Sequence, residues 1–234
     1  MTLSPLQDDR SSLVEKVCRQ LTLAIRQEKS GSPDLLPPER ELAVQFGVSR
    51  PVVREAMKRL ELQGLLEVRH GIGTRVVNRL HAPLNGSITL LIDDAHARLN
   101  QSLEVRAALE PEVARLAAER ITAATRKQQR AAHRKLVEAK ELGEAIEADI
   151  EFHRALAQAS GNEIFELVLN SMADLGRVSR QATMSVAGAE VARTHHARIL
   201  EAVVQGHAKA AELAMRQHIQ AAITDLTHGR TRKK

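Results

Sequence analysis

The feature that most constrains this chain is a helical periodicity of apolar residues that continues almost without interruption from about residue 88 to residue 229. Short breaks fall near 94–98, 122–125, 143, 161–162, 185–189 and 206, which predicts six or seven helices. The composition agrees, because the chain has three Phe, no Trp and no Tyr and is dominated by strong helix formers. We therefore expect a mainly α protein whose C-terminal part is an all-α bundle.

The N-terminal part follows a different plan. Helices are expected over 12–28, within "PPERELAVQF" and from Ser49 to Gly64, and two β-type runs at 65–69 and 74–77 flank a glycine-containing turn. Three helices followed by a hairpin, within about 70 residues, form the winged helix-turn-helix plan.

A segment rich in helix breakers, "NRLHAPLNGS", separates the two parts. We therefore predict four regions along the chain: a winged helix-turn-helix domain over 1–78, a linker over 79–88, an all-α domain over 89–229, and a basic tail over 230–234.

The third expected helix has an apolar face and a basic stripe beside it, made of Val53, Ala56, Met57 and Leu60 and of Arg50, Arg54 and Lys58 respectively. A helix in the major groove needs such a stripe, although solvated arginines on an ordinary amphipathic helix would give the same pattern. The hairpin favours DNA binding, because "RHGIGTR" places Arg69, His70 and Arg75 around glycines that let a backbone approach DNA closely.

The segment "LLPPERELAVQFGVSRPVVREAMKRLELQGLLEVRHGIGTRV" resembles, without gaps, the DNA-binding domain of GntR-type bacterial transcription regulators. It departs from the family pattern at Pro38, where Ser or Ala is usual, and at Met57, where Leu is usual. The resemblance implies DNA contacts from the two helices and the wing: Arg40, Ser49, Arg50, Arg54, His70 and Gly71.

The bulk properties are those of a protein that works inside the cell. The net charge of +5 permits nucleic acid as a partner without establishing it. Cys18 is the one cysteine, so no disulfide can form within the chain. There is no signal pattern and no run of 18 apolar residues, so we expect a cytoplasmic location and no membrane partner.

Acidic and histidine side chains fall on the apolar faces of three expected helices. Asp149 and His153 are four residues apart on one face, and His218 shares the inward side of the last helix. Of the adjacent pair, His196 lies in the middle of its apolar face and His195 near its edge. One such histidine is usually a hydrogen-bonded core residue, but the whole set also makes an N₃O ligand set for a divalent metal, with a catalytic role open as well.

Residues 90–228 resemble the FadR-type C-terminal ligand-binding domain of the same regulators, through "EVRAALEPEVARLAAER", "DIEFHRALAQASGN", "HHARILEAV" and "AMRQHI". In the metal-binding branch of that domain one Asp and three His hold the ion. The resemblance implies that these are Asp149, His153, His196 and His218. We expect a divalent ion, zinc in the first place, with nickel or manganese as alternatives.

Arg106 shares a face with Leu99, Leu103, Leu109 and Val113. An arginine among apolar residues needs an anion, which here is either a bound effector or the neighbouring Glu110. Open metal positions, this arginine and nearly ring-free walls favour a small carboxylate or sugar acid as the effector.

The sequence thus predicts a metabolite-responsive, sequence-specific repressor, not an enzyme, that binds a double-stranded operator as a homodimer. Two other functions are compatible with parts of the pattern. A metalloenzyme fused to a DNA-binding domain would show activity when loaded with metal, and we find no additional general base. An architectural protein would bind all DNA sequences equally, which an internal ligand site disfavours.

Overall fold

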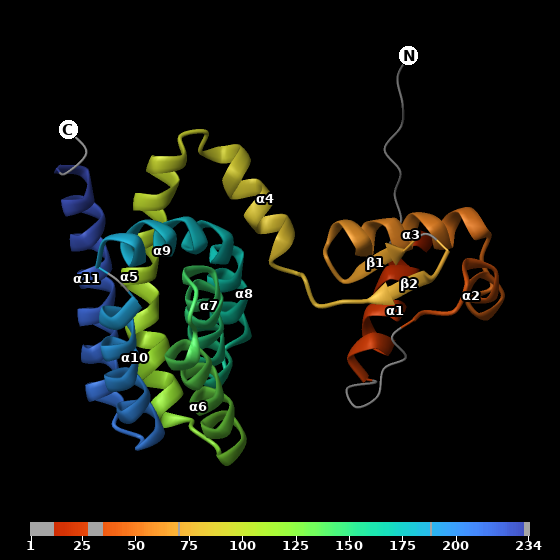
Figure 1. Ribbon diagram of the computed structural model, residues 1–234. Helices are drawn as coiled ribbons and strands as arrows, with labels where there is room; N and C mark the ends of the chain where they lie inside the picture. Colours follow the sequence, from red (N-terminus) through yellow and green to blue (C-terminus); the bar gives the residue numbers. More distant parts are fainter. Residues whose placement is uncertain (1–11, 28–34, 70, 188, 232–234) are drawn as a thin grey trace, which may run out of the picture. The chain divides into compact units, whose positions relative to one another are not determined.

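The structure is a computed structural model that describes residues 12–27, 35–69, 71–187 and 189–231. The chain divides into two compact units, Met1–Pro83 and Leu84–Lys234 (Figure 1). Within the described residues, no helix is long and apolar enough to cross a membrane.

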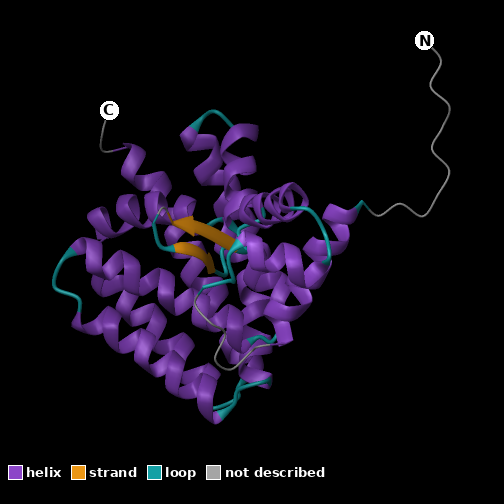
Figure 2. Ribbon diagram, turned by 90° about the vertical axis from the view of Figure 1, so that its right-hand side faces the viewer, coloured by secondary structure: helices purple, strands orange, loops and turns teal. Residues whose placement is uncertain are grey.

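The N-terminal unit holds three helices and a hairpin, as the sequence predicts. The elements are α1 (Leu13–Gln27), α2 (Glu39–Phe46), α3 (Arg50–Leu62), β1 (Leu66–Arg69) and β2 (Gly73–Val76). The strands pair antiparallel, with Leu66 opposite Val76 and Arg69 opposite Gly73, and they are drawn in orange in Figure 2. This arrangement confirms the winged helix-turn-helix fold.

Local signals set the ends of these helices. Ser12 and Glu15 form a capping box at the start of α1, with the Glu15 amide donating to Ser12 Oγ at 3.3 Å and the Ser12 amide to Glu15 Oε2 at 3.0 Å. The turn between α2 and α3 passes through Gly47 in the left-handed conformation, with φ 63°. Ser49 is the residue before α3, and its hydroxyl makes no capping bond there.

The apolar stripes of the three helices meet in one core, which contains Val17, Leu21, Leu42, Val53, Ala56, Met57, Leu60 and Leu66. The inward residues of α3 are those that the periodicity selected. Because this core uses only the inner face of α3, the basic residues of the same helix remain on the surface.

From residue 95 onward, the described residues of the C-terminal unit form seven helices, in line with the six or seven expected from the sequence. Their bounds are α5 (Ala95–Glu119), α6 (Ala123–Glu138), α7 (Leu142–Ala159), α8 (Glu163–Ser171), α9 (Ala173–Ala187), α10 (Ala189–Val204) and α11 (Ala208–Thr231). The boundary between α8 and α9, at Met172, carries no glycine or proline signal and was not expected from the sequence.

Two segments differ from their expected local structure. The breaker-rich stretch around 79–88 contains α4 (Ala82–Leu91), since Pro83 falls in the first turn, where its missing N–H costs nothing. A proline inside a helix usually kinks or ends it, but α5 is a single helix that continues past Pro111.

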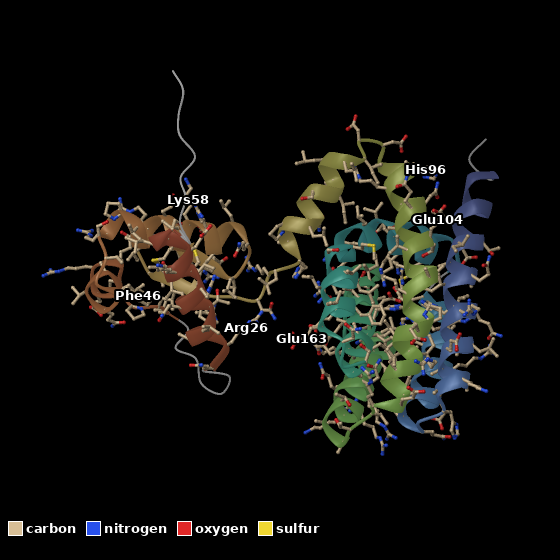
Figure 3. The ribbon with its side chains drawn as sticks, turned by 180° about the vertical axis from the view of Figure 1, so that it is seen from behind. Arg26, Phe46, Lys58, His96, Glu104 and Glu163 are labelled. Carbon is tan, nitrogen blue, oxygen red and sulfur yellow. The ribbon has the colours of Figure 1, made fainter. Side chains whose placement is uncertain are left out.

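Helices α5 and α11 lie side by side along much of their length, and α7, α9 and α10 pack around them (Figure 1). Figure 3 shows how side chains fill the space between these helices. The largest core cluster includes Val113, Phe152, Leu156, Ile199, Met215 and Ile219. This packing brings the polar residues on the inner faces of five helices into one place.

Candidate functional site

The four residues expected to bind a metal lie together inside the C-terminal unit. Asp149 and His153 come from α7, His196 from α10 and His218 from α11, and all four are buried. One ligand atom from each lies within 4.8 Å of all the others. The helical phase that placed His196 inward is confirmed, because its ring is fully buried whereas His195 is half-buried.

The distances between these atoms suit a small divalent ion. His196 Nε2 lies 3.2 Å from Asp149 Oδ1 and 3.4 Å from His218 Nε2, and His153 Nε2 lies 3.6 Å from Asp149 Oδ2. Two ligand atoms that are each about 2.1 Å from the ion are roughly 3.0 Å apart at neighbouring octahedral positions, which leave two positions open, and roughly 3.4 Å apart in a tetrahedron. His153 Nε2 is buried and has no hydrogen-bond partner among the described residues, which suits an atom that coordinates an ion.

Neighbouring side chains orient the rings. Phe152 stacks on His196 with ring centroids 4.3 Å apart and planes 11° from parallel. Glu110 Oε2 approaches His153 Nδ1 to 2.7 Å, although the ring does not point at it well enough for a regular hydrogen bond. A carboxylate behind the far ring nitrogen is the usual support of a metal-binding histidine, because it leaves Nε2 facing the ion.

Burial keeps His196 and His218 in the form that binds metal. It lowers the pKa of His196 to about 3, against the opposing effect of Asp149, and it lowers the pKa of His218 well below its ordinary value, helped by the neighbouring rings. Burial alone would raise the pKa of Asp149, but Arg180 and the histidines hold it below its ordinary range. At neutral pH the cluster therefore offers two neutral imidazoles, those of His196 and His218, and the Asp149 carboxylate.

Arg106, the expected effector residue, is buried on α5 and paired with Glu110, with Arg106 Nε 2.5 Å from Glu110 Oε1. The structure therefore contains the ion pair that the sequence left as the alternative to a bound anion. Glu110 is shared, since its other oxygen faces His153. Arg106 still lines the pocket beside the cluster, so an anion that enters the pocket meets this pair.

Arg180 was not selected from the sequence, yet it is buried on α9 with its Nε on Asp149 Oδ2. A helical glycine one turn earlier leaves room for it, because a Cβ on Gly176 would collide with the Arg180 guanidinium. A signal was present: Arg180 stands four residues after Gly176 and four before Met184, all three on one buried row. The reasoning that identified Arg106 applies equally to this row.

A pocket opens beside the cluster and is lined by five helices. Asp149, His218, Arg106 and Arg180 contribute to it, and both arginines also line a second pocket. The empty space in the first pocket and its mouth is about 470 Å³, but a water-sized sphere can move through only about 40 Å³ of it. A ligand larger than a few water molecules therefore requires side chains to move.

The residues expected to contact DNA lie on the surface of the N-terminal unit. Arg40, Ser49, Arg50, Arg54 and Gly71 are all exposed, and His70 lies outside the described residues. Lys58, labelled in Figure 3, is also exposed on α3. The Arg54 guanidinium donates to the Glu39 carboxylate at 2.9–3.1 Å, so this arginine has a partner already in the free protein.

A winged helix-turn-helix joined to a helical unit is an architecture of DNA-binding transcriptional regulators. Residues 13–76 match the family described as "Bacterial regulatory proteins, gntR family", and residues 101–221 match the FCD domain. The chain belongs to the GntR family of transcriptional regulators and carries an FCD domain. This family is one of transcription regulators, which confirms the prediction that the chain is not an enzyme.

Individual relatives agree over nearly the whole chain. The HTH-type transcriptional regulator LutR of Bacillus subtilis is 37% identical over 199 residues, 80% of this chain and 88% of that protein. The Glc operon transcriptional activator of Escherichia coli is 31% identical and covers 92% of this chain and 89% of its own length. The solved structure titled Streptococcus agalactiae GntR is 28% identical, covers 88% of this chain and 97% of its own, and gives a TM-score of 0.71.

Proposed function

We propose that this regulator is a metabolite-responsive repressor whose C-terminal unit binds a divalent metal ion and a small carboxylate or sugar acid. The observation that carries the proposal is the convergence of Asp149 and three histidines beside a pocket that two buried arginines also line. Cationic groups and coordinating groups at one pocket wall select an anionic ligand.

Asp149, His153, His196 and His218 would hold the ion, which we take to be zinc, with nickel or manganese as alternatives. When bound, the ion supplies a Lewis acid with open positions for a carboxylate oxygen of the effector. Glu110 keeps the His153 ring turned so that Nε2 faces the cluster.

Arg180 has two roles in this proposal. In the structure it neutralises Asp149, so the buried carboxylate is not left unpaired. When Asp149 serves as a metal ligand, the guanidinium becomes available to the carboxylate of an effector in the adjoining pocket. Arg106 assists from the same wall while it retains Glu110 as its partner.

The N-terminal unit would read the operator. Arg50 and Arg54 on α3 would enter the major groove, Arg40 and Ser49 would contact DNA beside it, and His70 and Gly71 would contact DNA from the wing. One short helix contacts few base pairs, so we expect a homodimer on a two-fold symmetric operator, with the C-terminal units supplying most of the dimer contact. Both events belong in the cytoplasm.

Effector binding can regulate transcription only if it favours one arrangement of the N-terminal units of the two protomers over another. We expect the coupling to pass through residues 79–88, between the predicted domains over 1–78 and 89–229, with 230–234 as a tail that takes no part. Repression relieved by effector is the direction implied by the family resemblance, although one relative is named an activator.

Metal analysis of four purified variants tests the site. His153→Ala, His196→Ala and His218→Ala should each lose most of the bound metal, whereas His195→Ala, next to a ligand but only half-buried, should keep it. Operator binding with and without small carboxylates then tests the response. If His195→Ala removes the metal and His196→Ala retains it, or if no carboxylate binds the metal-loaded protein, the proposal is wrong.

A further inference from the structure

The pocket beside the cluster has polar groups at two ends and apolar walls between them. Its α11 wall is a single stripe: His218, Ala221, Ala222 and Asp225. The rise of an α-helix separates the first and last of these by about 10 Å along the axis. His218 belongs to the cluster, so Asp225 marks the far end of the pocket.

The α10 wall places a second polar group, His195, between the cluster and that far end. Helices α10 and α11 pack together and are joined by only a short turn at residues 205–207, so they run antiparallel (Figure 1). Going from His196 back along α10 therefore leads in the same direction as going from His218 forward along α11. His195 and Asp225 both line the pocket and lie within electrostatic reach of each other.

The apolar middle consists of small side chains. Ala192 on α10 and Ala221 and Ala222 on α11 line it, and Met184 and Val191 complete the wall. Alanines leave room for a ligand backbone that carries substituents. Within the described part of the chain, the Asp225 carboxylate makes no hydrogen bond or ion pair. The His195 ring lies beside the His218 ring, with the two centroids 5.7 Å apart.

We infer that His195 and Asp225 form a second polar subsite for hydroxyl groups, so the effector is a polyhydroxylated carboxylic acid rather than a short or purely aliphatic one. The inference rests on the proposed function, which places the carboxylate at the cluster. The axial separation of about 10 Å, less the reach of side chains at both ends, suits a carbon chain of roughly four to six atoms.

Hydroxyl groups fit the subsite of His195 and Asp225 better than an ammonium group does. A hydroxyl can donate to the Asp225 carboxylate and accept from the His195 ring, so it uses both partners at once. An ammonium group only donates, and it would meet Arg198, whose charge already acts on His195, as well as the arginines further in. The charge of Arg198 near His195 therefore disfavours a cationic ligand at this subsite.

Calorimetry on the metal-loaded full chain tests the subsite. Aldonic acids of four to six carbons are compared with the n-alkanoates of equal length, after dialysis against metal-free buffer because hydroxy acids also bind free ions. The variants are Asp225→Ala and His195→Leu, with Gln220→Ala, exposed on the same helix, as the matched control. Metal content and melting temperature verify that each variant is folded.

At least one aldonic acid should bind the wild type roughly tenfold or more tightly than its alkanoate, as a hydrogen bond to a charged group predicts. Asp225→Ala and His195→Leu should abolish most of that advantage, Gln220→Ala should keep it, and glycolate, too short to reach the far end, should bind all four proteins alike. If alkanoates bind as tightly as aldonic acids, or if both pocket variants keep the preference, the subsite is wrong while the proposed function stands. If no carboxylate binds, the proposed function fails as well.

Discussion

The two units of this chain use charged side chains in opposite ways. In the N-terminal unit the Arg54–Glu39 pair lies on the surface, with the two side chains 64% and 29% exposed. In the C-terminal unit the corresponding fractions are 8% and 3% for Arg180–Asp149 and 6% and 4% for Arg106–Glu110.

Exposed charges are solvated whether or not they are paired, so they can be rearranged for a partner such as DNA at little cost to the fold. Buried charges lose most of their hydration and depend on each other. We therefore expect function and stability to be separable in the N-terminal unit and tightly linked around the cluster.

The largest effect is expected for Asp149→Ala. Removal of this carboxylate leaves Arg180 buried without its partner, which should lower the free energy of unfolding of the metal-free protein by about 3–5 kcal/mol. Chemical denaturation of protein treated with a chelator measures this. The double variant Asp149→Ala/Arg180→Met should recover much of the loss without recovering metal binding; a double variant as unstable as the single one would contradict the assigned pairing.

Acid should destabilise the metal-free C-terminal unit next most strongly. Burial lowers the pKa of His196 to about 3, so the folded state keeps the ring neutral where the unfolded chain protonates it, below about 6.5. The contribution of His196 to the free energy of unfolding is complete above that pH and falls by about 1.4 kcal/mol per pH unit as the pH drops toward 3. The lowered pKa of His218 acts in the same direction.

Denaturation curves between pH 7 and pH 5 measure this slope, with His207→Gln as the control because His207 is exposed. A stability that rises on acidification would mean that the buried rings gain protons on folding, contrary to the geometry.

Arg50→Ala tests whether an exposed charge of the N-terminal unit can be removed without loss of stability. The variant should lose about 1–3 kcal/mol of discrimination between operator and random DNA, as expected for one bidentate contact with guanine. Its melting temperature should stay near that of the wild type, because Arg50 is exposed and lies off the apolar face of α3. Equal losses on operator and random DNA would instead identify Arg50 as a phosphate contact.

Glu39→Gln should have the smallest effect on the fold, with a change in melting temperature of at most about 2 °C. DNA binding should change more visibly, since Arg54 loses the carboxylate that engages it in the free protein. We expect tighter binding to all DNA sequences and a smaller operator preference, measured by titration of both DNAs at one salt concentration. A large loss of stability would show that this surface pair supports the fold after all.

Sequence alone determined which residues of each helix face inward. The 3.6-residue period placed Asp149 and His153 together, chose His196 over His195, and put the arginines of α3 outside the core, because each of these depends only on spacing within one helix. The winged helix-turn-helix was equally local, since it follows from breaks, caps and alternation along the chain, whereas the boundary between α8 and α9 had no such signal.

The tertiary structure decided which of these faces meet. The helical period predicts the inward side of α9, but it does not predict that Arg180 contacts Asp149 on α7. Nor does it predict that Glu110 lies between Arg106 and His153. It also does not show that α10 and α11 line one pocket, with His195 beside the cluster and Asp225 at the far end. Partners of this kind depend on how separate helices pack, and packing is set by the shapes of whole faces rather than by the spacing within any one of them.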